Sequence, residues 1–211
     1  MAVLPTVIVL AAGRGSRFMA ASHKLAAPLG EQSVLATTLR HAIESHLHVV
    51  VVTTPCFADL ARSHVAARDV VLVPEVGSDG LPGLGMGYSI AAGVSARPND
   101  GGWLILPGDM PLVQPQSLLA VAQALEQHPV AFAQHLGRRG HPVGFAAELY
   151  SELSALSGDA GARRLVARYP AHAVELDDPG VLVDIDTEAD LLLARAAQND
   201  TAPLPHHAAN G

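Results

Sequence analysis

The sequence predicts a single-domain α/β protein with three layers, in which helices cover both faces of a mostly parallel, doubly wound sheet. Short β-branched runs alternate along the chain with longer Ala- and Leu-rich stretches, as expected of successive βαβ units. Hydrophobic residues make up 49% of the 211 residues but aromatic residues only 4%, so the apolar mass is Ala, Val and Leu. That composition suits buried parallel strands under alanine-rich helices, in a chain long enough for one substantial domain.

The predicted strands are short apolar runs bounded by turn residues. In chain order they are residues 6–10, 48–53, 70–73, 103–106, 130–134, 174–176 and 181–186, and residues 141–145 are expected to be extended. Ligands of doubly wound sheets bind beyond the carboxyl ends of the strands. Residues that directly follow a strand are therefore the first candidates for a functional site.

The predicted helices are longer segments with helical spacing, as in residues 33–45, where Leu35, Leu39, Ala42 and Ile43 share one side. The others are residues 57–67, 113–127, 147–156, 161–169 and 187–198, with one more helix that follows the glycine-dense loop 77–87 and ends near residue 96. Residues 1–198 therefore form one predicted domain. Residues 199–211 contain two prolines and no periodicity, and we expect a disordered tail there.

The bulk properties exclude several classes of protein. The net charge is −7 and Lys and Arg form no cluster, which argues against a nucleic-acid surface but not against a nucleotide ligand. No apolar run approaches the roughly 20 residues that cross a bilayer. Cys56 is alone, so no internal disulfide forms, and the first ten residues lack the basic flank of a secretion signal. We expect a cytoplasmic protein.

A glycine-rich loop follows the first strand. Its small residues allow the backbone to approach a ligand closely, and its successive N–H groups can form an anion-binding nest. Arg17 can grip phosphate oxygens with two hydrogen bonds and Lys24 can add a point charge, so the loop is a candidate triphosphate site, although ordinary tight turns also use Gly-x-Gly. The candidate residues are Leu10, Ala11, Ala12, Gly13, Gly15, Ser16, Arg17 and Lys24.

This loop differs from two common phosphate-binding motifs. No third glycine follows Arg17, as a dinucleotide fingerprint requires, and no Gly-Lys-Ser/Thr follows, as a P-loop requires. The second strand, residues 48–53, is also not closed by an acidic residue. These absences argue against a dinucleotide oxidoreductase, although the α/β pattern would suit one.

Three carboxylates are candidate ligands of magnesium, which binds one or two carboxylates together with substrate phosphates and water. Asp109 follows strand 103–106 at the ligand edge of the sheet, where a turn aspartate is the alternative interpretation. Asp184 and Asp186 lie two residues apart in a segment predicted to be extended, so they point to the same face. For Asp186 the alternative is a role near the helix cap that Thr187 and Asp190 suggest.

A second glycine-rich loop, residues 83–93, runs into a helix that begins near Tyr88 and Ser89. A helix N-terminus offers free N–H groups to an anion, although glycines are also common in connections that only need flexibility. The loop is therefore a second candidate ligand-binding segment. Arg138 and Arg139 are either solvent-exposed or phosphate-binding.

Together these segments resemble the nucleotidyltransferases similar to molybdenum cofactor cytidylyltransferase. The matches occur in the family's order from residue 7 to about residue 192. They are residues 10–17 (LAAGRGSR) with Lys24 and 28–30 (PLG), then 85–93 (GMGYSIAAG), 106–112 (LPGDMPL), 140–143 (GHPV), 158–162 (GDAGA) and 184–191 (DIDTEADL). The pattern departs from the family between Arg17 and Lys24, where residues 19–23 replace a shorter connection that contains glycine.

The resemblance implies a Rossmann-like fold of the nucleotide-diphospho-sugar transferase type and the following roles. Arg17, Lys24 and Asp109 would be catalytic, and Mg²⁺ would be bound by Asp109 and Asp186, with Asp184 a weaker candidate. The nucleotide would contact the first loop, Gly85 and Ser89. The acceptor would contact Gly85, Met86, Gly87, His141, Pro142 and Asp159, although His141 can also be an ordinary loop residue and Asp159 a helix cap.

The implied reaction moves CMP from CTP to a phosphorylated acceptor, molybdenum cofactor (molybdopterin), and releases pyrophosphate. Ala12 stands where GTP-using relatives tend to carry a second glycine, which favours CTP. A molybdoenzyme or its maturation chaperone would be the protein partner. The alternatives are GTP as donor, a sugar phosphate or another phosphorylated metabolite as acceptor, or a non-catalytic nucleotide-binding domain on the same fold.

Overall fold

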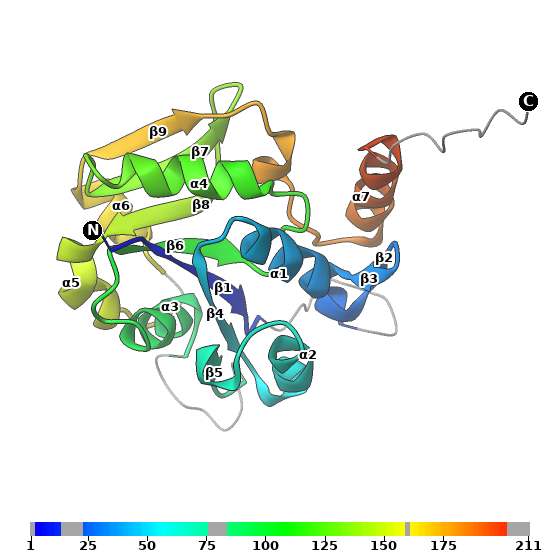
Figure 1. Cartoon of the computed structure of the whole chain (residues 1–211), viewed down its shortest axis with the longest axis horizontal. Coiled ribbons are helices and arrows are strands. Elements are labelled where there is room, and N and C mark those ends of the chain that lie inside the picture. The colour runs from blue at the N-terminus through cyan, green and yellow to red at the C-terminus, as the bar shows by residue number, and fades with distance from the viewer. Residues whose placement is uncertain (1–2, 14–22, 76–83, 159–160, 202–211) are drawn as a thin grey trace, which may run out of the picture.

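The computed structural model describes residues 3–13, 23–75, 84–158 and 161–201, with side chains up to residue 197. Its centre is a seven-stranded sheet in the order β5-β4-β1-β6-β8-β7-β9 (Figure 1). β8 runs antiparallel to β6 and β7, whereas the other neighbouring strands are parallel, and this confirms the predicted mostly parallel α/β fold. The strands are β1 (Thr6–Ala11), β4 (His48–Thr53), β5 (Val70–Leu72), β6 (Gly102–Pro107), β7 (Val130–His135), β8 (Arg138–Ala146) and β9 (Ala171–Glu175).

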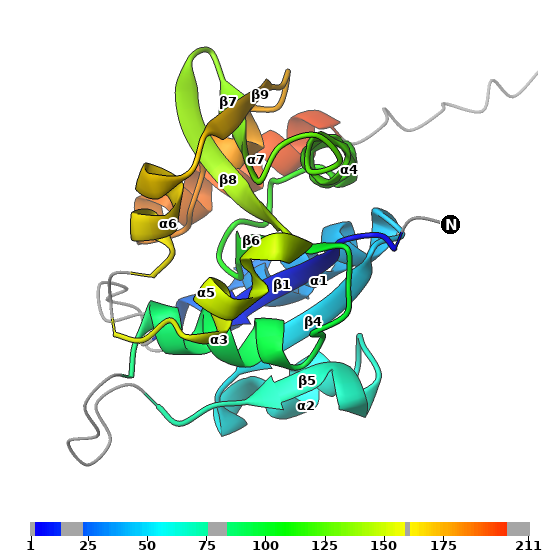
Figure 2. The same ribbon diagram turned by 90° about the vertical axis from the view of Figure 1, so that its left-hand side faces the viewer.

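Helices cover both faces of this sheet, as Figures 1 and 2 show. The first face carries α1 (Val34–Glu44), α2 (Ala58–Arg62) and α4 (Pro115–Ala124), and the second carries α3 (Met86–Ser95), α5 (Tyr150–Ser154) and α6 (Arg163–Arg168). The last helix, α7 (Glu188–Thr201), packs beside a small hairpin of β2 (Pro28–Leu29) and β3 (Gln32–Ser33). Every helix among the described residues is too short or too polar to span a lipid bilayer.

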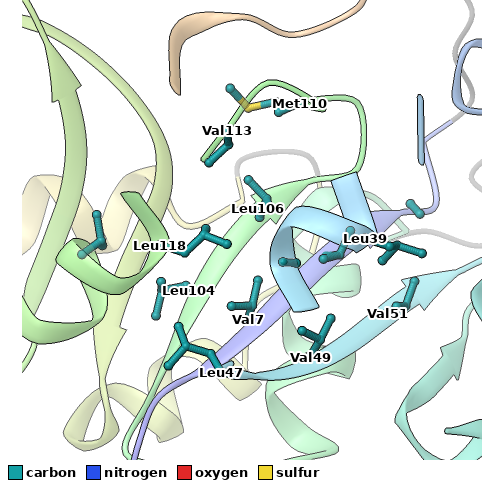
Figure 3. Packing of buried hydrophobic residues seen from close by; sticks show 14 of the residues in the cluster. Val7, Leu39, Leu47, Val49, Val51, Leu104, Leu106, Met110, Val113 and Leu118 are labelled. Atoms are coloured by element: carbon teal, nitrogen blue, oxygen red, sulfur yellow. The ribbon is translucent and has the colours of Figure 1, made fainter. Parts of the chain in front are cut away.

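The strand period of two divides the core into two clusters. In β1, Val7 and Val9 point to the face of α1 and α4, and Ile8 points to the face of α3. Figure 3 shows the first cluster, where Val7 packs among Leu39, Leu104 and Val49. The side chains of Val7, Ile8 and Val9 have no exposed surface, so β1 lies at the buried centre of the molecule. The carboxyl end of this strand therefore has a fixed position.

A third apolar cluster anchors the end of the chain. Ile185 and Leu191, from the segment before α7 and from α7 itself, pack against Leu29 and Val34 beside the β2–β3 hairpin. Arg195 adds hydrogen bonds from its guanidinium to the carbonyl oxygen of Pro28. The C-terminal segment is thereby held next to the first third of the chain.

The predicted strand at residues 181–186 is wrong. The segment forms a 3-10 helix, Pro179–Leu182, followed by irregular backbone. Asp178 caps this helix, because its carboxylate accepts a hydrogen bond from the N–H of Gly180 at 2.9 Å. Downstream, the N–H of Ile185 donates to the carbonyl oxygen of Asp109 at 2.9 Å, so the segment bonds to a loop instead of extending the sheet.

Other predicted elements differ from the structure in their boundaries. β8 begins at Arg138, three residues before the expected extended segment, and α7 continues three residues beyond 198. The expected helices 57–67 and 147–156 are each shorter and adjoin a 3-10 turn. The β2–β3 hairpin and the 3-10 turn Lys24–Ala26 were not predicted.

α1 helps to fix the loop after β6. The hydroxyl oxygen of Thr38 lies 3.0 Å from the carbonyl oxygen of Gly108 and 3.1 Å from that of Val34, and it is buried. The N–H of Gly108 donates to the carbonyl oxygen of Leu10 at 2.8 Å. The loop that carries Asp109 is therefore bonded to both β1 and α1.

Thr38→Val should lower the free energy of unfolding by about 1–2 kcal/mol, because it leaves the buried carbonyl of Gly108 with one partner fewer. The matched control is Thr37→Val on the same helix, whose hydroxyl bonds only to the partly exposed Ser33 carbonyl. Denaturant unfolding should show a smaller loss for this control. Equal losses for the two variants would contradict the role given to Thr38.

Candidate functional site

A cleft of about 740 Å³ opens at the carboxyl ends of β1 and β6. It brings together residues from seven separate segments of the chain, at the strand ends where the rule for doubly wound sheets places ligands. Of the predicted site residues, those that line it are Leu10, Ala12, Gly13, Lys24, Gly85, Met86, Ser89, Asp109, His141, Asp184 and Asp186. Glycine and alanine at the tip of β1 leave this side of the cleft open to close approach by a ligand.

The remaining predicted residues fall into two groups. Ala11, Gly87 and Pro142 lie near the cleft but do not line it: Ala11 ends β1, Gly87 donates its N–H to the Gly158 carbonyl at 2.9 Å, and Pro142 follows a cis peptide bond in β8. Gly15, Ser16, Arg17 and Asp159 lie outside the described residues.

Lys24 joins two of the predicted carboxylates. Its Nζ lies 2.6 Å from Oδ2 of Asp109 and 2.6 Å from Oδ1 of Asp186. The Lys24 side chain is 12% exposed, and those of Asp109 and Asp186 are 16% and 31% exposed. Burial lowers the pKa of Lys24, but the negative charge of Asp109 and hydrogen bonds to both carboxylates outweigh it, so the pKa is raised above 10.5 and Lys24 is charged.

A backbone contact holds Asp109 close to Asp186. Asp109 follows β6, and its carbonyl oxygen accepts the hydrogen bond from Ile185, one residue before Asp186. The cap of α7 is formed by Thr187 and Asp190, whose carboxylate accepts hydrogen bonds from the N–H of Asp186 and of Thr187. The cap is thus a separate feature, and the Asp186 carboxylate points to Lys24.

The residues between the glycine loop and Lys24 end in a structural contact. The His23 ring lies 3.0 Å from the carbonyl oxygen of Gly13 through Nε2 and accepts the N–H of Leu25 through Nδ1 at 3.2 Å. It therefore bridges the two described ends of the loop, and this contact sets where the Lys24–Ala26 turn begins. Lys24 reaches the cleft although residues 19–23 depart from the family pattern.

The donor set at Asp109 fits a divalent cation. Two carboxylates converge on one point, and the second oxygen of Asp109, Oδ1, is buried without a hydrogen-bond partner among the described residues. Among the described residues, no group of three or more His, Cys, Asp or Glu side chains is arranged so that it could hold a metal ion by itself. Two carboxylates suit magnesium, which takes its other ligands from phosphates and water. Asp184 lines the same cleft.

His141 lines the same cleft from the first half of β8. Burial lowers the pKa of its imidazole below 6.5, and its Nδ1 is buried without a partner among the described residues. The ring is therefore neutral near pH 7 and presents a hydrogen-bonding nitrogen rather than a charge.

A second, mostly apolar pocket of about 480 Å³ adjoins the cleft and shares Met86, Arg139, His141 and Arg163 with it. Its apolar lining comes from α3, β6, β8 and α6 and consists of Ile90, Ile105, Val143, Phe145, Ala162, Val166 and Ala167. Arg139 is exposed and also packs over the Phe132 ring at 4.5 Å, and Arg163 was not among the predicted residues. No motif singles out Arg163, because one arginine beside another at a helix start looks like solvated surface.

The family model for the MobA-like NTP transferase domain matches residues 7–174. The chain belongs to this family. It is therefore an NTP transferase, and the cleft at the tips of β1 and β6 is its candidate active site. Cytidylyl specificity and a molybdenum cofactor acceptor go beyond what the family match shows.

Three relatives of this NTP transferase illustrate the likeness. Purine catabolism protein PucB of Bacillus subtilis is 32% identical over 202 residues, 91% of this chain and 96% of PucB. A structure of Mycobacterium tuberculosis Rv0371c in complex with manganese is 26% identical and has a TM-score of 0.74. The match covers 93% of this chain and 100% of the Rv0371c chain. A nucleotidyl transferase from Methanothermobacter thermautotroptrophicus is 25% identical with a TM-score of 0.76, over 94% and 99% of the two chains.

His141 should make the NTP transferase less stable in acid. Its pKa is held below 6.5, so the unfolded chain takes up a proton that the folded protein does not as the pH falls through 6.5. Stability is therefore lost as the pH decreases, and His141→Gln should reduce the loss measured by denaturant unfolding between about pH 7.5 and about pH 5.5. Burial also lowers the pKa of His41. Part of the loss of stability in acid therefore remains in the His141→Gln variant as well as in the wild type.

The control for this measurement is His46→Asn, at an exposed position in the turn between α1 and β4, where asparagine tolerates the positive φ. It should leave the acid sensitivity of the wild type unchanged. An unaltered pH dependence in the His141 variant would show that this imidazole is not held neutral by the fold.

Proposed function

We propose that this enzyme moves CMP from CTP to a phosphorylated acceptor, molybdenum cofactor (molybdopterin), and releases pyrophosphate. The observation that carries the proposal is the contact of Lys24 with both Asp109 and Asp186, on the wall of a cleft that also contains Gly13. A triphosphate in this cleft meets a cation, carboxylates able to hold a metal ion, and the exposed backbone after β1. Few other ligands need all three.

The chemistry requires charge screening more than proton transfer. The acceptor phosphate is already anionic near neutral pH, since the second pKa of a phosphomonoester is about 6, and it attacks the α-phosphorus of CTP. The P–O bond to the leaving pyrophosphate breaks as the new P–O bond forms. Repulsion between the two anions is the main barrier, and Lys24 and the backbone N–H groups at the tip of β1 lower it.

Asp109 and Asp186 are the residues that would hold magnesium. When bound there, the ion supplies positive charge to the phosphates and to the departing pyrophosphate. The manganese complex of Rv0371c supports a divalent ion in this fold. Arg17 is proposed to add a bidentate contact to the phosphates, as the resemblance implies.

The preference for CTP is proposed from Ala12, which directly follows β1 and lines the cleft. A methyl group there narrows the space beside the base relative to glycine, and a pyrimidine needs less room than a purine. The family resemblance supports the same assignment.

The adjoining pocket supports an acceptor that combines a flat organic body with an anionic group. Its apolar walls suit a heterocycle, and Arg139 and Arg163 can meet a phosphate at its entrance. A pterin fits this description, and so does a purine. The similarity to PucB, whose name refers to purine catabolism, makes a phosphorylated purine metabolite the second candidate acceptor.

Asp109→Asn should reduce pyrophosphate release by about a hundred- to a thousandfold, the effect of losing one key electrostatic group in a transition state. The matched control is Asp59→Asn, an exposed aspartate of α2 that should retain wild-type turnover. The assay combines all four nucleoside triphosphates with molybdopterin, phosphorylated purines and sugar phosphates. CTP with molybdopterin should give the highest kcat/KM.

Two results would refute this proposal. Wild-type turnover in Asp109→Asn would remove the assigned role of the carboxylate. Magnesium-dependent CTP binding without pyrophosphate release for any acceptor would instead favour a non-catalytic nucleotide-binding domain.

A further inference from the structure

Lys24 is the only lysine in the sequence, which has twelve arginines. It is not a surface residue: its side chain is 12% exposed and lies in the cleft between Asp109 and Asp186. An ammonium group is a compact point charge that two carboxylates can share from opposite sides, whereas a planar guanidinium needs a wider, oriented site. The position thus suits a small cation.

The ammonium stands where a divalent ion bound by the same carboxylates would stand. Both carboxylate oxygens lie 2.6 Å from Nζ, so they are no farther apart than twice that distance. Divalent ions bind carboxylate oxygens at roughly 2.0–2.6 Å, so an ion held by both residues takes nearly the same point. Lysine and metal ion therefore compete, because two cations cannot share one position.

The lysine does not satisfy the site completely. Oδ1 of Asp109 is buried and has no partner among the described residues, although Oδ2 of the same carboxylate is paired with Lys24. A buried carboxylate oxygen without a donor is costly, so this oxygen points to a ligand that the described residues do not supply. The two carboxylates thus suit a divalent ion as an alternative to the Lys24 ammonium.

We propose that Lys24 keeps divalent ions out of the Asp109–Asp186 site until a triphosphate enters the cleft. The triphosphate draws the ammonium to its oxygens, for which lysine is a common partner, and the carboxylates become free for the ion. Metal and nucleotide then bind in a coupled way, and each raises the affinity for the other by the same factor. The proposal rests on the proposed function for the identity of the incoming anion.

The test is Mn²⁺ binding, measured from the electron paramagnetic resonance signal of free Mn²⁺ in titrations without nucleotide. Lys24→Met removes the charged end group and keeps an unbranched side chain that is only one atom shorter. It should bind Mn²⁺ at least about tenfold more tightly than the wild type, because the carboxylates no longer have an internal cation to displace. With α,β-methylene-CTP added, the wild type should reach the affinity of the variant, after correction for Mn²⁺ bound by the analogue alone.

The matched control is Arg62→Met, which removes one positive charge from an exposed ion pair with Asp59, away from the cleft. It should bind Mn²⁺ like the wild type. Equal tightening in both variants would reduce the effect to net charge and overturn the proposal. Unchanged Mn²⁺ affinity in Lys24→Met would overturn it as well.

A second measurement uses the wild type and does not depend on a variant that folds. With only one lysine, protein labelled with ¹⁵N at the lysine side chain gives a single Nζ resonance. Mg²⁺ alone should leave this resonance in place, and Mg²⁺ with α,β-methylene-CTP should shift it. A shift of the same size with Mg²⁺ alone would show that the ion enters without the nucleotide and would overturn the proposal.

These experiments do not measure turnover, so they can fail separately from the proposed function. If no acceptor supports pyrophosphate release but Lys24→Met still binds Mn²⁺ more tightly and the CTP analogue still shifts the Nζ resonance, the transfer reaction is refuted and the role of Lys24 stands. If CTP and molybdopterin react but the wild type, Lys24→Met and Arg62→Met bind Mn²⁺ with the same affinity, the transfer reaction stands and the role of Lys24 is refuted.

Discussion

The contact between Lys24, Asp109 and Asp186 is the constraint on which the site depends. Three mostly buried charges meet from the first, middle and last parts of the described chain. Removing one partner would leave an uncompensated charge in a poorly solvated place, which costs several kcal/mol in typical buried pairs. The surrounding backbone hydrogen bonds, from Gly108 to Leu10 and from Ile185 to Asp109, serve to bring these charges together.

Much of the fold and of the site follows from local sequence. The buried strands β1, β4 and β6 correspond to apolar runs with clear ends in the sequence. The rule that ligands bind beyond strand ends then leads directly to Gly13 and Asp109. These two residues do line one cleft in the structure. The prediction works here because a parallel sheet places the tips of neighbouring strands side by side whatever the details of the helices.

The contacts that the sequence does not reveal are those made between distant segments. Residues 181–186 have the apolar pattern of a strand, but they join none of the seven strands, and Ile185 bonds instead to the carbonyl oxygen of Asp109. Asp184 and Asp186 look equivalent in the sequence, yet Asp186 is the one within ion-pair distance of Lys24. The bridge made by His23 from Gly13 to Leu25 is equally invisible, since no periodicity marks a side chain that closes a loop.

The direction of β8 explains how His141 reaches the cleft from the first half of a strand. In a fully parallel sheet, residues 139–141 at the start of a strand would lie at the edge away from the ligand. Because β8 runs antiparallel to β6, with Ala146 opposite Gly102 and Val143 opposite Ile105, its first residues reach the carboxyl ends of β1 and β6. Arg139 and His141 thus face the cleft from a strand that the usual rule would discount. Val143 and Phe145, farther along β8, line the adjoining pocket together with Arg139 and His141. One strand therefore supplies both polar and apolar contacts to a single pocket.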